Sequence, residues 1–554
     1  MQQLDYIVMG IFALLIFSIG MVFTRMASRN ASAFFEAGGA TPWWINGLSL
    51  FISYFSAGTF VVWGSIAYQH GFVANGIQLT MVFGGLLTAL FIAGRWKRTK
   101  KTTAAEWLQH RYGSPTRKFY TLLVILYSLF ATAAVLYPVG KMISVATSLS
   151  LGASILAIGG LIIVYTAAGG LWAVLVTDVV QFVVLTAAVL IVIPMAFSEA
   201  GGAHAFTSKA PPEFFHLFNS DYSFGFFLAF LVYQTAYIGG NWAYVQRYTS
   251  VATPRQATKV AWLFTALYLV CPFIWMLPPM IYRVLDPSLK GVQAEGAYML
   301  LCQRVLPAGL IGLVLSGMVS ATASKANTTI NMVAVVFARD VCRSKINSPV
   351  SDRRAIRIAR IFTVVFGGLT IGIACLVPLV GGIVEMVLST ASIAGGALFL
   401  PLVWSLYSRR QTPASLITAS LAGLLISLAL KLAGGPLGIH LSRFAETATG
   451  VGIPLIVLAV RELYPVHPAE SAPAIPQADD PAGMEQAPGI AHAYTKQNRF
   501  GVRVIAISVA LVGAGITLLG FLAEKGLVAR WVGAFIFLMA IPAWISVHPA
   551  KTAR

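Results

Sequence analysis

The sequence predicts an all-α integral membrane protein, and its composition, its apolar runs and the placement of its charges each support that prediction. Residues of the apolar set AVILMFWYC make up 58% of the 554 residues, and only 10% are charged. Ordinary soluble domains contain about 25% charged residues. Too few polar side chains are present to cover several soluble domains, which excludes a soluble enzyme, a disordered scaffold and a collagen-like fibre.

Apolar runs of membrane-spanning length recur along the whole chain. About 20 apolar residues are needed to cross the hydrocarbon core of a bilayer. This criterion predicts fifteen transmembrane helices, at residues 5–24, 43–69, 74–96, 119–147, 152–169, 174–198, 223–246, 258–283, 306–338, 357–378, 383–408, 413–432, 444–463, 501–522 and 528–547.

The net charge of +19 arises from 38 Lys and Arg residues against 19 Asp and Glu residues. Most of the basic residues lie in short segments between the apolar runs and not on one soluble patch, so no nucleic-acid partner is expected. The positive-inside rule then places the N-terminus outside and the C-terminus in the cytoplasm of a multi-pass protein of the cell inner (plasma) membrane. The four Cys residues are far apart, which predicts neither a disulfide framework nor a metal site.

The chain contains none of the short motifs that would give it hydrolytic or nucleotide-driven chemistry. HExxH, GxSxG and GxxxxGK[ST] are all missing from the sequence, so we expect no enzyme activity and no organic cofactor. A protein of this kind that moves a solute must draw on an existing gradient. We expect a monomer whose partners are a small solute, sodium or protons, and the lipid bilayer.

Two predicted spans are interrupted at their centres by small and polar residues. The span 43–69 contains the hydroxyl-rich patch 53–59, and the span 223–246 contains Gly239, Gly240 and Asn241. Irregular backbone survives in a membrane only where it lines a cavity, although close helix packing explains the first patch equally well. Two interrupted helices five spans apart are typical of an inverted-repeat transporter with its site at the midplane.

These features predict a division of the chain into six parts. A polar stretch rich in Pro, Ala and Asp near residue 480 is typical of a flexible linker. The parts are an N-terminal accessory helix and loop (1–42), repeat one (43–200), repeat two (201–411), accessory helices (412–464), a cytoplasmic linker (465–500) and a C-terminal helix pair (501–554).

Three segments of the sequence carry a resemblance to a known family. They are Gly169 to Val174 followed by Thr177, Asp178 and Gln181, which matches GGLxAVxxTDxxQ; Gly240-Asn241 to Gln246-Arg247; and Gly317-Met318 through Ser324, Asn331 and Asp340. From about residue 5 to 465 the chain resembles the sodium:solute symporter family. The resemblance implies a five-plus-five inverted-repeat (LeuT-like) transporter core, here with extra N-terminal and C-terminal helices.

The resemblance also implies a cation site between the first broken helix and the span that contains Ser324. Backbone carbonyls of Ile52 and Phe55 and the hydroxyl of Ser324 would hold sodium there, but the second hydroxyl position is occupied by Lys325. A lysine in mid-membrane costs at least about 2.5–3.5 kcal/mol, so it should be paired or functional. We expect its ammonium either to replace sodium, making transport sodium-independent, or to couple transport to protons.

Two alternatives remain open for Lys325 at this cation site, and one for Asp178. Lys325 could form a purely structural contact while sodium binds elsewhere, and a shift of one helical turn would place Ser320 at the site instead. Asp178 is the expected partner of Lys325 and is placed on the cation path, with a helix-start role as its own alternative. If Lys325 does not replace it, sodium is the metal ion expected at the site.

By the same resemblance, five residues are expected to contact the solute: Gly58, Thr59, Gln234, Tyr237 and Glu385. Tyr237 also matches an aromatic residue that closes the site from the inside, and Tyr54 occupies a position that is polar in relatives. The alternative for Glu385 is a carboxylate at an outer helix start after Gly382.

The predicted function is therefore secondary active import of a small polar solute by alternating access. A sugar, polyol or sugar acid is preferred, because Gln, Tyr, Thr and one carboxylate suit a solute with hydroxyl groups. A sodium-coupled symporter of an amino acid or small carboxylate is the alternative, and a non-transporting sensor or channel on the same scaffold is a further one.

Overall fold

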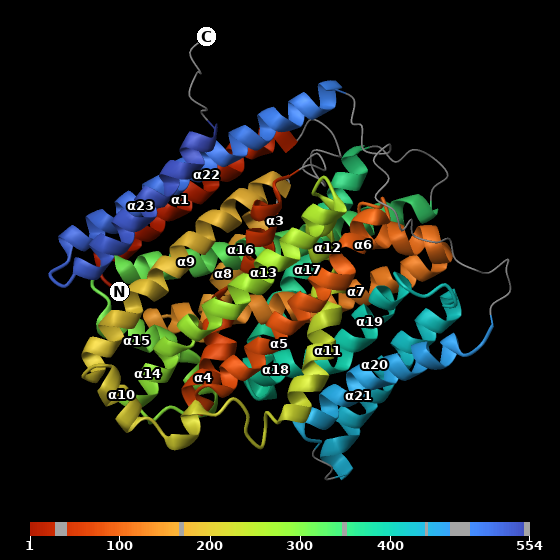
Figure 1. The fold of residues 1–554 in the computed structure, drawn as a ribbon, viewed down its shortest axis with the longest axis horizontal. Helices are drawn as coiled ribbons and strands as arrows, with labels where there is room; N and C mark the ends of the chain where they lie inside the picture. Colours follow the sequence, from red (N-terminus) through yellow and green to blue (C-terminus); the bar gives the residue numbers. More distant parts are fainter. Residues whose placement is uncertain (28–40, 166–170, 346–351, 438–440, 466–487, 548–554) are drawn as a thin grey trace.

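The computed structural model describes the whole chain except residues 28–40, 166–170, 346–351, 438–440, 466–487 and 548–554, and the described regular elements are all helical (Figure 1). Eleven helices are long and apolar enough to cross a membrane, and four further apolar helices are shorter. Together these helices correspond one by one to the fifteen predicted spans, which confirms the predicted all-α membrane architecture.

The first part of the chain contains the first broken span and the two long helices that follow it. Its elements are α1 (Gln3–Ala27), α3 (Trp43–Ile52), η1 (Thr59–Trp63), α4 (Gly64–His70), α5 (Val73–Leu87), η2 (Thr88–Ile92), α6 (Ala93–Arg98), α7 (Ala104–Ala146), α8 (Leu151–Tyr165), α9 (Leu171–Ala200), α10 (Ala203–Lys209) and η3 (Pro212–Phe215).

The middle part contains the second broken span and the helix that carries Lys325. Its elements are α11 (Phe224–Gly240), α12 (Trp242–Thr249), α13 (Pro254–Trp275), α14 (Leu277–Leu285), η4 (Gly291–Gly296), α15 (Ala297–Val305), α16 (Leu310–Lys345), α17 (Asp352–Leu376), η5 (Val377–Val380), α18 (Ile383–Thr390), η6 (Ala391–Gly395) and α19 (Gly396–Ser405).

The last part consists of two helix pairs on opposite sides of the molecule. Its elements are α20 (Pro413–Leu437), α21 (Arg443–Glu462), α22 (Pro488–Leu522) and α23 (Leu527–Val547). α22 and α23 pack on each other and on α9, whereas α20 and α21 lie next to α19, and α21 also contacts α11 (Figure 1). Because α22 begins at Pro488, the stretch predicted as a linker over 465–500 ends earlier than expected.

Both predicted interruptions are real breaks in the helical backbone. α3 ends at Ile52, residues 53–56 are not helical, and helical geometry resumes at Ala57 and Gly58, directly before η1. α11 ends at Gly240, and Asn241 has the extended angles φ −63° and ψ 129° before α12 begins. The Asn241 side chain accepts a hydrogen bond from the backbone N–H of Ala243 at 3.0 Å and caps α12. The prediction of two broken helices is confirmed, and helix packing alone does not explain the first patch.

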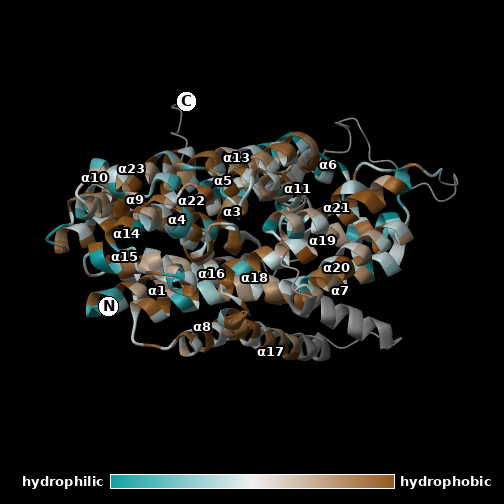
Figure 2. Cartoon of the chain, turned by 90° about the horizontal axis from the view of Figure 1, so that it is seen from below, coloured by the Kyte–Doolittle hydropathy of each residue, from teal (hydrophilic) through white to brown (hydrophobic). Residues whose placement is uncertain are grey.

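The surface of the helix bundle is apolar, as a bilayer requires. Large apolar side chains are exposed on several helices, among them Leu369 on α17, Leu425 on α20 and Trp531 on α23. Figure 2 shows hydrophobic residues along these outer helices. One buried charge has a structural explanation: Asp5 accepts hydrogen bonds from the N–H groups of Gly309 and Gly312, next to the start of α16. This contact fixes α1 against α16.

Candidate functional site

A cavity of about 100 Å³ lies where the two broken helices meet α7, α9 and α16. We call it the helix-break cavity. Its lining contains five of the residues predicted from sequence, namely Ile52, Asp178, Tyr237, Ser324 and Lys325. Residues from both broken helices therefore line one cavity, as the inverted-repeat interpretation expects.

Lys325 reaches from α16 into the break that follows α3. Its Nζ donates a hydrogen bond to the carbonyl oxygen of Ser53 at 2.7 Å. Ser53 is the first residue after α3, at the start of the irregular segment between α3 and η1. A backbone carbonyl at a helix break is the kind of oxygen that binds a cation in transporters of this architecture. The ammonium of Lys325 thus takes a position suited to a bound cation.

Asp178 does not pair with Lys325, contrary to the expectation from sequence. Among the described residues no carboxylate lies within 4 Å of the Lys325 ammonium. Asp178 Oδ2 instead accepts a hydrogen bond from Ser49 Oγ at 2.6 Å, and Oδ1 accepts a longer one of 3.5 Å from Ser324 Oγ. Asp178 lies two turns into α9, so the alternative of a helix-start role is also wrong.

Ser49 connects Asp178 to a buried arginine that sequence reasoning did not assign to the site. The Nε and Nη2 atoms of Arg247 lie 3.4 and 3.3 Å from Ser49 Oγ, which therefore accepts from Arg247 while donating to Asp178. Arg247 Nη1 also donates to the carbonyl of Ala243. Ser49 lies one turn before Ser53 in α3, and this spacing could have indicated that both face the same region.

One turn earlier on α16, Ser320 has a different partner. Gln181 Nε2 on α9 donates to Ser320 Oγ at 2.9 Å. The alternative register, with Ser320 at the cation position, would leave Lys325 away from the helix break. The contact between Lys325 and Ser53 agrees instead with the gapless register, in which Ser324 and Lys325 face α3.

Tyrosines surround the helix-break cavity on the side of the second broken helix. The ring of Tyr237 lies 5.8 Å from that of Tyr54 and 5.5 Å from that of Tyr244, and Phe399 is 5.1 Å away. Tyr54 fills a position that the resemblance marks as polar in relatives, so its ring takes up space beside the cavity. Tyr244 and Phe399 were not predicted, because aromatic residues in apolar spans carry no distinctive signal.

The remaining residues predicted for this site lie beside the cavity and do not line it. Thr59 accepts a hydrogen bond from the N–H of Ser56 and donates to the carbonyl of Tyr54, so it stabilises the break itself. Phe55 stacks on Trp275 with ring centroids 3.5 Å apart. Gly58 has helical backbone angles and directly precedes η1, and Gln234 is buried on α11.

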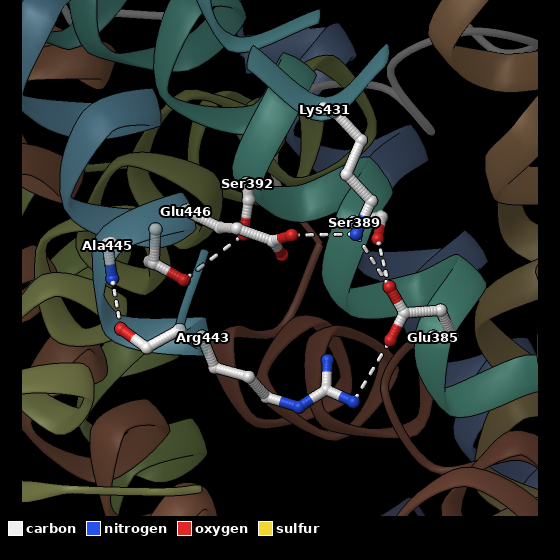
Figure 3. Close-up of polar contacts among 9 residues, drawn as sticks. Glu385, Ser389, Ser392, Lys431, Arg443, Ala445 and Glu446 are labelled. Atoms are coloured by element: carbon white, nitrogen blue, oxygen red, sulfur yellow. Dashed lines mark hydrogen bonds and ion pairs between the residues drawn. The ribbon is translucent and has the colours of Figure 1, made fainter. Parts of the chain in front are cut away.

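Glu385 lies in a different and larger cavity of about 620 Å³, which we call the Glu385 cavity. The residue Glu385 belongs to the first turn of α18. Its carboxylate contacts Lys431 at 2.7 Å and Arg443 at 3.0 Å, and Lys431 also contacts Glu446 at 2.7 Å (Figure 3). This position is the helix start named as the alternative for Glu385, and it connects α18 to α20 and α21.

Comparison with known proteins places these features in a family. The family model "Sodium:solute symporter family" matches residues 34–423. The human sodium/iodide cotransporter is 31% identical over 449 residues, which cover 76% of this chain and 68% of that protein. The sodium/sialic acid symporter of Aliivibrio fischeri is 27% identical over 383 residues, covering 66% of this chain and 74% of that protein.

A solved structure shares the fold. It is a sodium-coupled sialic acid symporter described as substrate-bound and outward-open, with a TM-score of 0.68 and 21% sequence identity, covering 85% of this chain and 99% of that one. The likeness agrees with the five-plus-five inverted-repeat architecture expected from the broken helices. The chain is a membrane transporter and not an enzyme: it belongs to the sodium:solute symporter family.

Proposed function

We propose that this protein imports a small polar solute by alternating access, and that the ammonium of Lys325 takes the place of the usual sodium ion. The observation that carries the proposal is the 2.7 Å hydrogen bond from Lys325 Nζ to the Ser53 carbonyl in the break after α3. The position of the protein in the membrane is part of the proposal, with the N-terminus outside the cell and the C-terminus in the cytoplasm.

Charge repulsion supports the exclusion of sodium from this position. A sodium ion held by the same carbonyls would lie within a few ångströms of the ammonium. Two unit charges 4 Å apart repel by about 4 kcal/mol at an effective dielectric constant near 20. That penalty lowers an affinity by roughly a thousandfold. A sodium site with Lys325 protonated would therefore be too weak to couple transport.

Lys325 differs from a sodium ion in that it can lose its proton but cannot leave the protein. If it keeps its proton throughout the cycle, transport is independent of any ion gradient. If it gives up its proton in one state of the cycle, transport is driven by protons. Asp178 and Arg247 are the other charged groups among the described lining residues of the same cavity.

We propose a sugar, polyol or sugar acid as the solute. Relatives include a sodium/glucose cotransporter of Vibrio parahaemolyticus, 26% identical over 418 residues, and the sialic acid symporter described above. Tyr237, Gln181 and Asn241 offer hydroxyl and amide groups around the helix-break cavity. Gly58, Thr59 and Gln234 remain proposed solute contacts, and Glu385 is proposed to meet the solute as it enters.

A small carboxylate is the second candidate, because the charges around the cavity favour an anion. Lys325 and Arg247 are cationic, whereas Asp178 is the one carboxylate among the described lining residues. The hydrogen bonds from Ser49 and Ser324 already partly satisfy Asp178. The excess positive charge belongs to Lys325, which donates its hydrogen bond to a neutral carbonyl.

Sodium binding can be tested before the solute is known. Purified wild-type protein and the variants Lys325→Ser and Lys325→Arg are titrated with sodium chloride, with choline chloride as the ionic-strength control, while the thermal midpoint is measured. We expect no sodium-specific stabilisation of wild type or Lys325→Arg. Lys325→Ser restores the second hydroxyl and should gain a sodium-specific rise. Equal sodium stabilisation of wild type and Lys325→Ser would remove Lys325 from the mechanism.

Uptake into proteoliposomes then tests transport and its driving force. A thermal-shift screen of sugars, polyols, sugar acids, small carboxylates and amino acids supplies the solute. Uptake is measured under a sodium gradient, under a proton gradient and with no gradient. Accumulation that requires protons in wild type, and sodium in Lys325→Ser, is the expected result for a coupled carrier. Conductance without uptake of any solute would favour the sensor or channel alternative.

A further inference from the structure

We propose that a cleft between α6, α13 and Tyr407 binds the phosphate head group of an anionic phospholipid. The cleft has a volume of about 260 Å³ and shares no lining residue with the helix-break cavity or the Glu385 cavity. Its described lining residues include Arg95, Arg98 and Arg255 and neither Asp nor Glu. Three arginines give the cleft a basic lining, which suits an anionic ligand.

Arg95 is held in a fixed position on the wall of the cleft. Its guanidinium carbon lies 3.9 Å from the centre of the Tyr407 ring, and Nη1 donates to the carbonyl of Leu406 at 3.3 Å. Tyr407 in turn donates its hydroxyl hydrogen to the carbonyl of Phe91. A guanidinium stacked on an aromatic ring still presents planar N–H donors, whose geometry suits phosphate oxygens.

The start of α13 adds further groups suited to an anion. α13 begins at Pro254, which lines the cleft together with Arg255 and Thr258. The N-terminal end of a helix carries a partial positive charge, and the Thr258 hydroxyl can donate a hydrogen bond. Arg255 is exposed, so its side chain can turn toward a ligand without breaking the packing of the bundle.

The other edge of the cleft is apolar, and this distinguishes a lipid from a free phosphate ion. Leu90 and Phe91 line the cleft with 55% and 56% of their surface exposed, on the last turns of the membrane span Val73–Arg98. Side chains exposed at that depth face the acyl chains of the bilayer. A ligand with a phosphate group joined to acyl chains matches both edges at once.

The position along the membrane normal also suits a head group. Arg95 and Arg98 lie in the last turn of α6, where the apolar span ends. Basic pockets between transmembrane helices at the cytoplasmic surface are typical binding sites for anionic head groups. The proposal rests on these contacts and not on the role of Lys325, so it can be tested independently of the proposed transport function.

Native mass spectrometry of the full-length protein can test the site. The probe is phosphatidylglycerol, compared with phosphatidylcholine of the same acyl chains and with free glycerol phosphate. The cleft variant is Arg98→Gln/Arg255→Gln, which keeps Arg95 and its packing on Tyr407. The matched control is Lys100→Gln/Lys101→Gln, which removes two positive charges from the segment after α6 without touching the cleft lining.

We expect wild type and the control variant to retain one tightly bound phosphatidylglycerol and the cleft variant to bind it about tenfold or more weakly, since each basic residue near the surface contributes about 1 kcal/mol. Equal retention in the cleft variant would overturn the proposal. Equal binding of phosphatidylcholine, or of glycerol phosphate, would overturn it as well. Circular dichroism of each variant checks that the helices are intact.

Discussion

The two cavities hold their charges in different ways. Around the helix-break cavity, the Ser49 hydroxyl lies between Asp178 and Arg247, and Lys325 contacts a backbone carbonyl. In the described structure, no ion pair within 4 Å joins these three charged residues. In the Glu385 cavity, two carboxylates contact Lys431 directly and one of them also contacts Arg443. Asp178 and Arg247 are thus buried and connected through a neutral group, whereas the charges of the second kind are partly exposed and connect helices directly.

This difference matches the two tasks that a transporter must combine. A direct ion pair between buried groups is costly to break, because each separated charge would remain without a partner. The arrangement around Asp178 instead connects the charges through the Ser49 hydroxyl, next to the break after α3. The ion pairs around Glu385 join α18 to α20 and α21, where a stable connection is useful.

The largest effect on stability is expected from Ser49→Ala, which tests the hydroxyl-mediated arrangement. Ser49 is fully buried and donates to Asp178 at 2.6 Å. Losing a hydrogen bond to a charged group costs about 1.5–3 kcal/mol. We expect the thermal midpoint of the purified protein to fall clearly and solute uptake to fall with it.

Ser53→Ala, at the C-terminal cap of the same helix, is the matched control. The Ser53 hydroxyl donates only to the Ser49 carbonyl in its own helix, at 2.7 Å, and the carbonyl that binds Lys325 is retained in the variant. Its effect should be less than half that of Ser49→Ala. An equal fall of the thermal midpoint in the two variants would mean that the contact with Asp178 does not contribute more to stability than a hydrogen bond within the helix.

A smaller effect is expected from Glu385→Gln, which tests the ion pairs. The side chains of Glu385 and Lys431 are 31% and 34% exposed, so solvent screens their attraction. Partly exposed pairs contribute about 1 kcal/mol or less, and salt weakens them further. We expect a modest fall in the thermal midpoint that shrinks as the salt concentration rises.

Glu199→Gln provides the comparison for an isolated surface pair. Glu199 contacts Arg304 at 2.9 Å, and both side chains are more exposed, at 41% and 45%. Its substitution should cost less than that of Glu385, which contacts two cations. A larger loss from Glu199→Gln, or a Glu385→Gln loss that does not depend on salt, would contradict the assignment of Glu385 to a network that fastens helices.

The smallest effect concerns pH and His70, which lines the Glu385 cavity at the end of α4. Burial lowers the pKa of His70 below its ordinary value of 6.5, with Asp221 opposing this and Arg443 and Arg283 adding to it. The folded protein therefore favours neutral His70, so stability should fall as the pH drops below 6.5. His70→Gln should reduce that loss, as a thermal midpoint series from pH 8 to pH 5 would reveal. An unchanged series would rule His70 out as the cause.

The sequence was sufficient to predict the fold and the position of the unusual lysine. Apolar runs of fixed length require helices, because every backbone polar group in a bilayer must be paired within its own segment. Gly239, Gly240 and Asn241 in mid-span indicated the second break for the same reason. An alignment of one helix to the family pattern without gaps placed Ser324 and Lys325 at the two hydroxyl positions, since a helix fixes the spacing of its side chains.

The partners of these residues could not be predicted. Asp178 was expected to pair with Lys325, yet it contacts Ser49, which lies 129 positions away in the chain. Ser49 in turn contacts Arg247, 198 positions away. Helical periodicity fixes neighbours three or four residues apart, but it does not fix how one helix is rotated against another.

The amino-acid sequence alone therefore determined which segments span the membrane, where two of them break, and that one span carries a lysine directly after Ser324. Only the tertiary structure decided that Lys325 binds the Ser53 carbonyl, that Asp178 is joined to Arg247 through Ser49, and that Glu385 belongs to a separate cavity. The first set depends on local chemistry along each helix. The second depends on distances of a few ångströms between helices, which packing of the whole bundle sets.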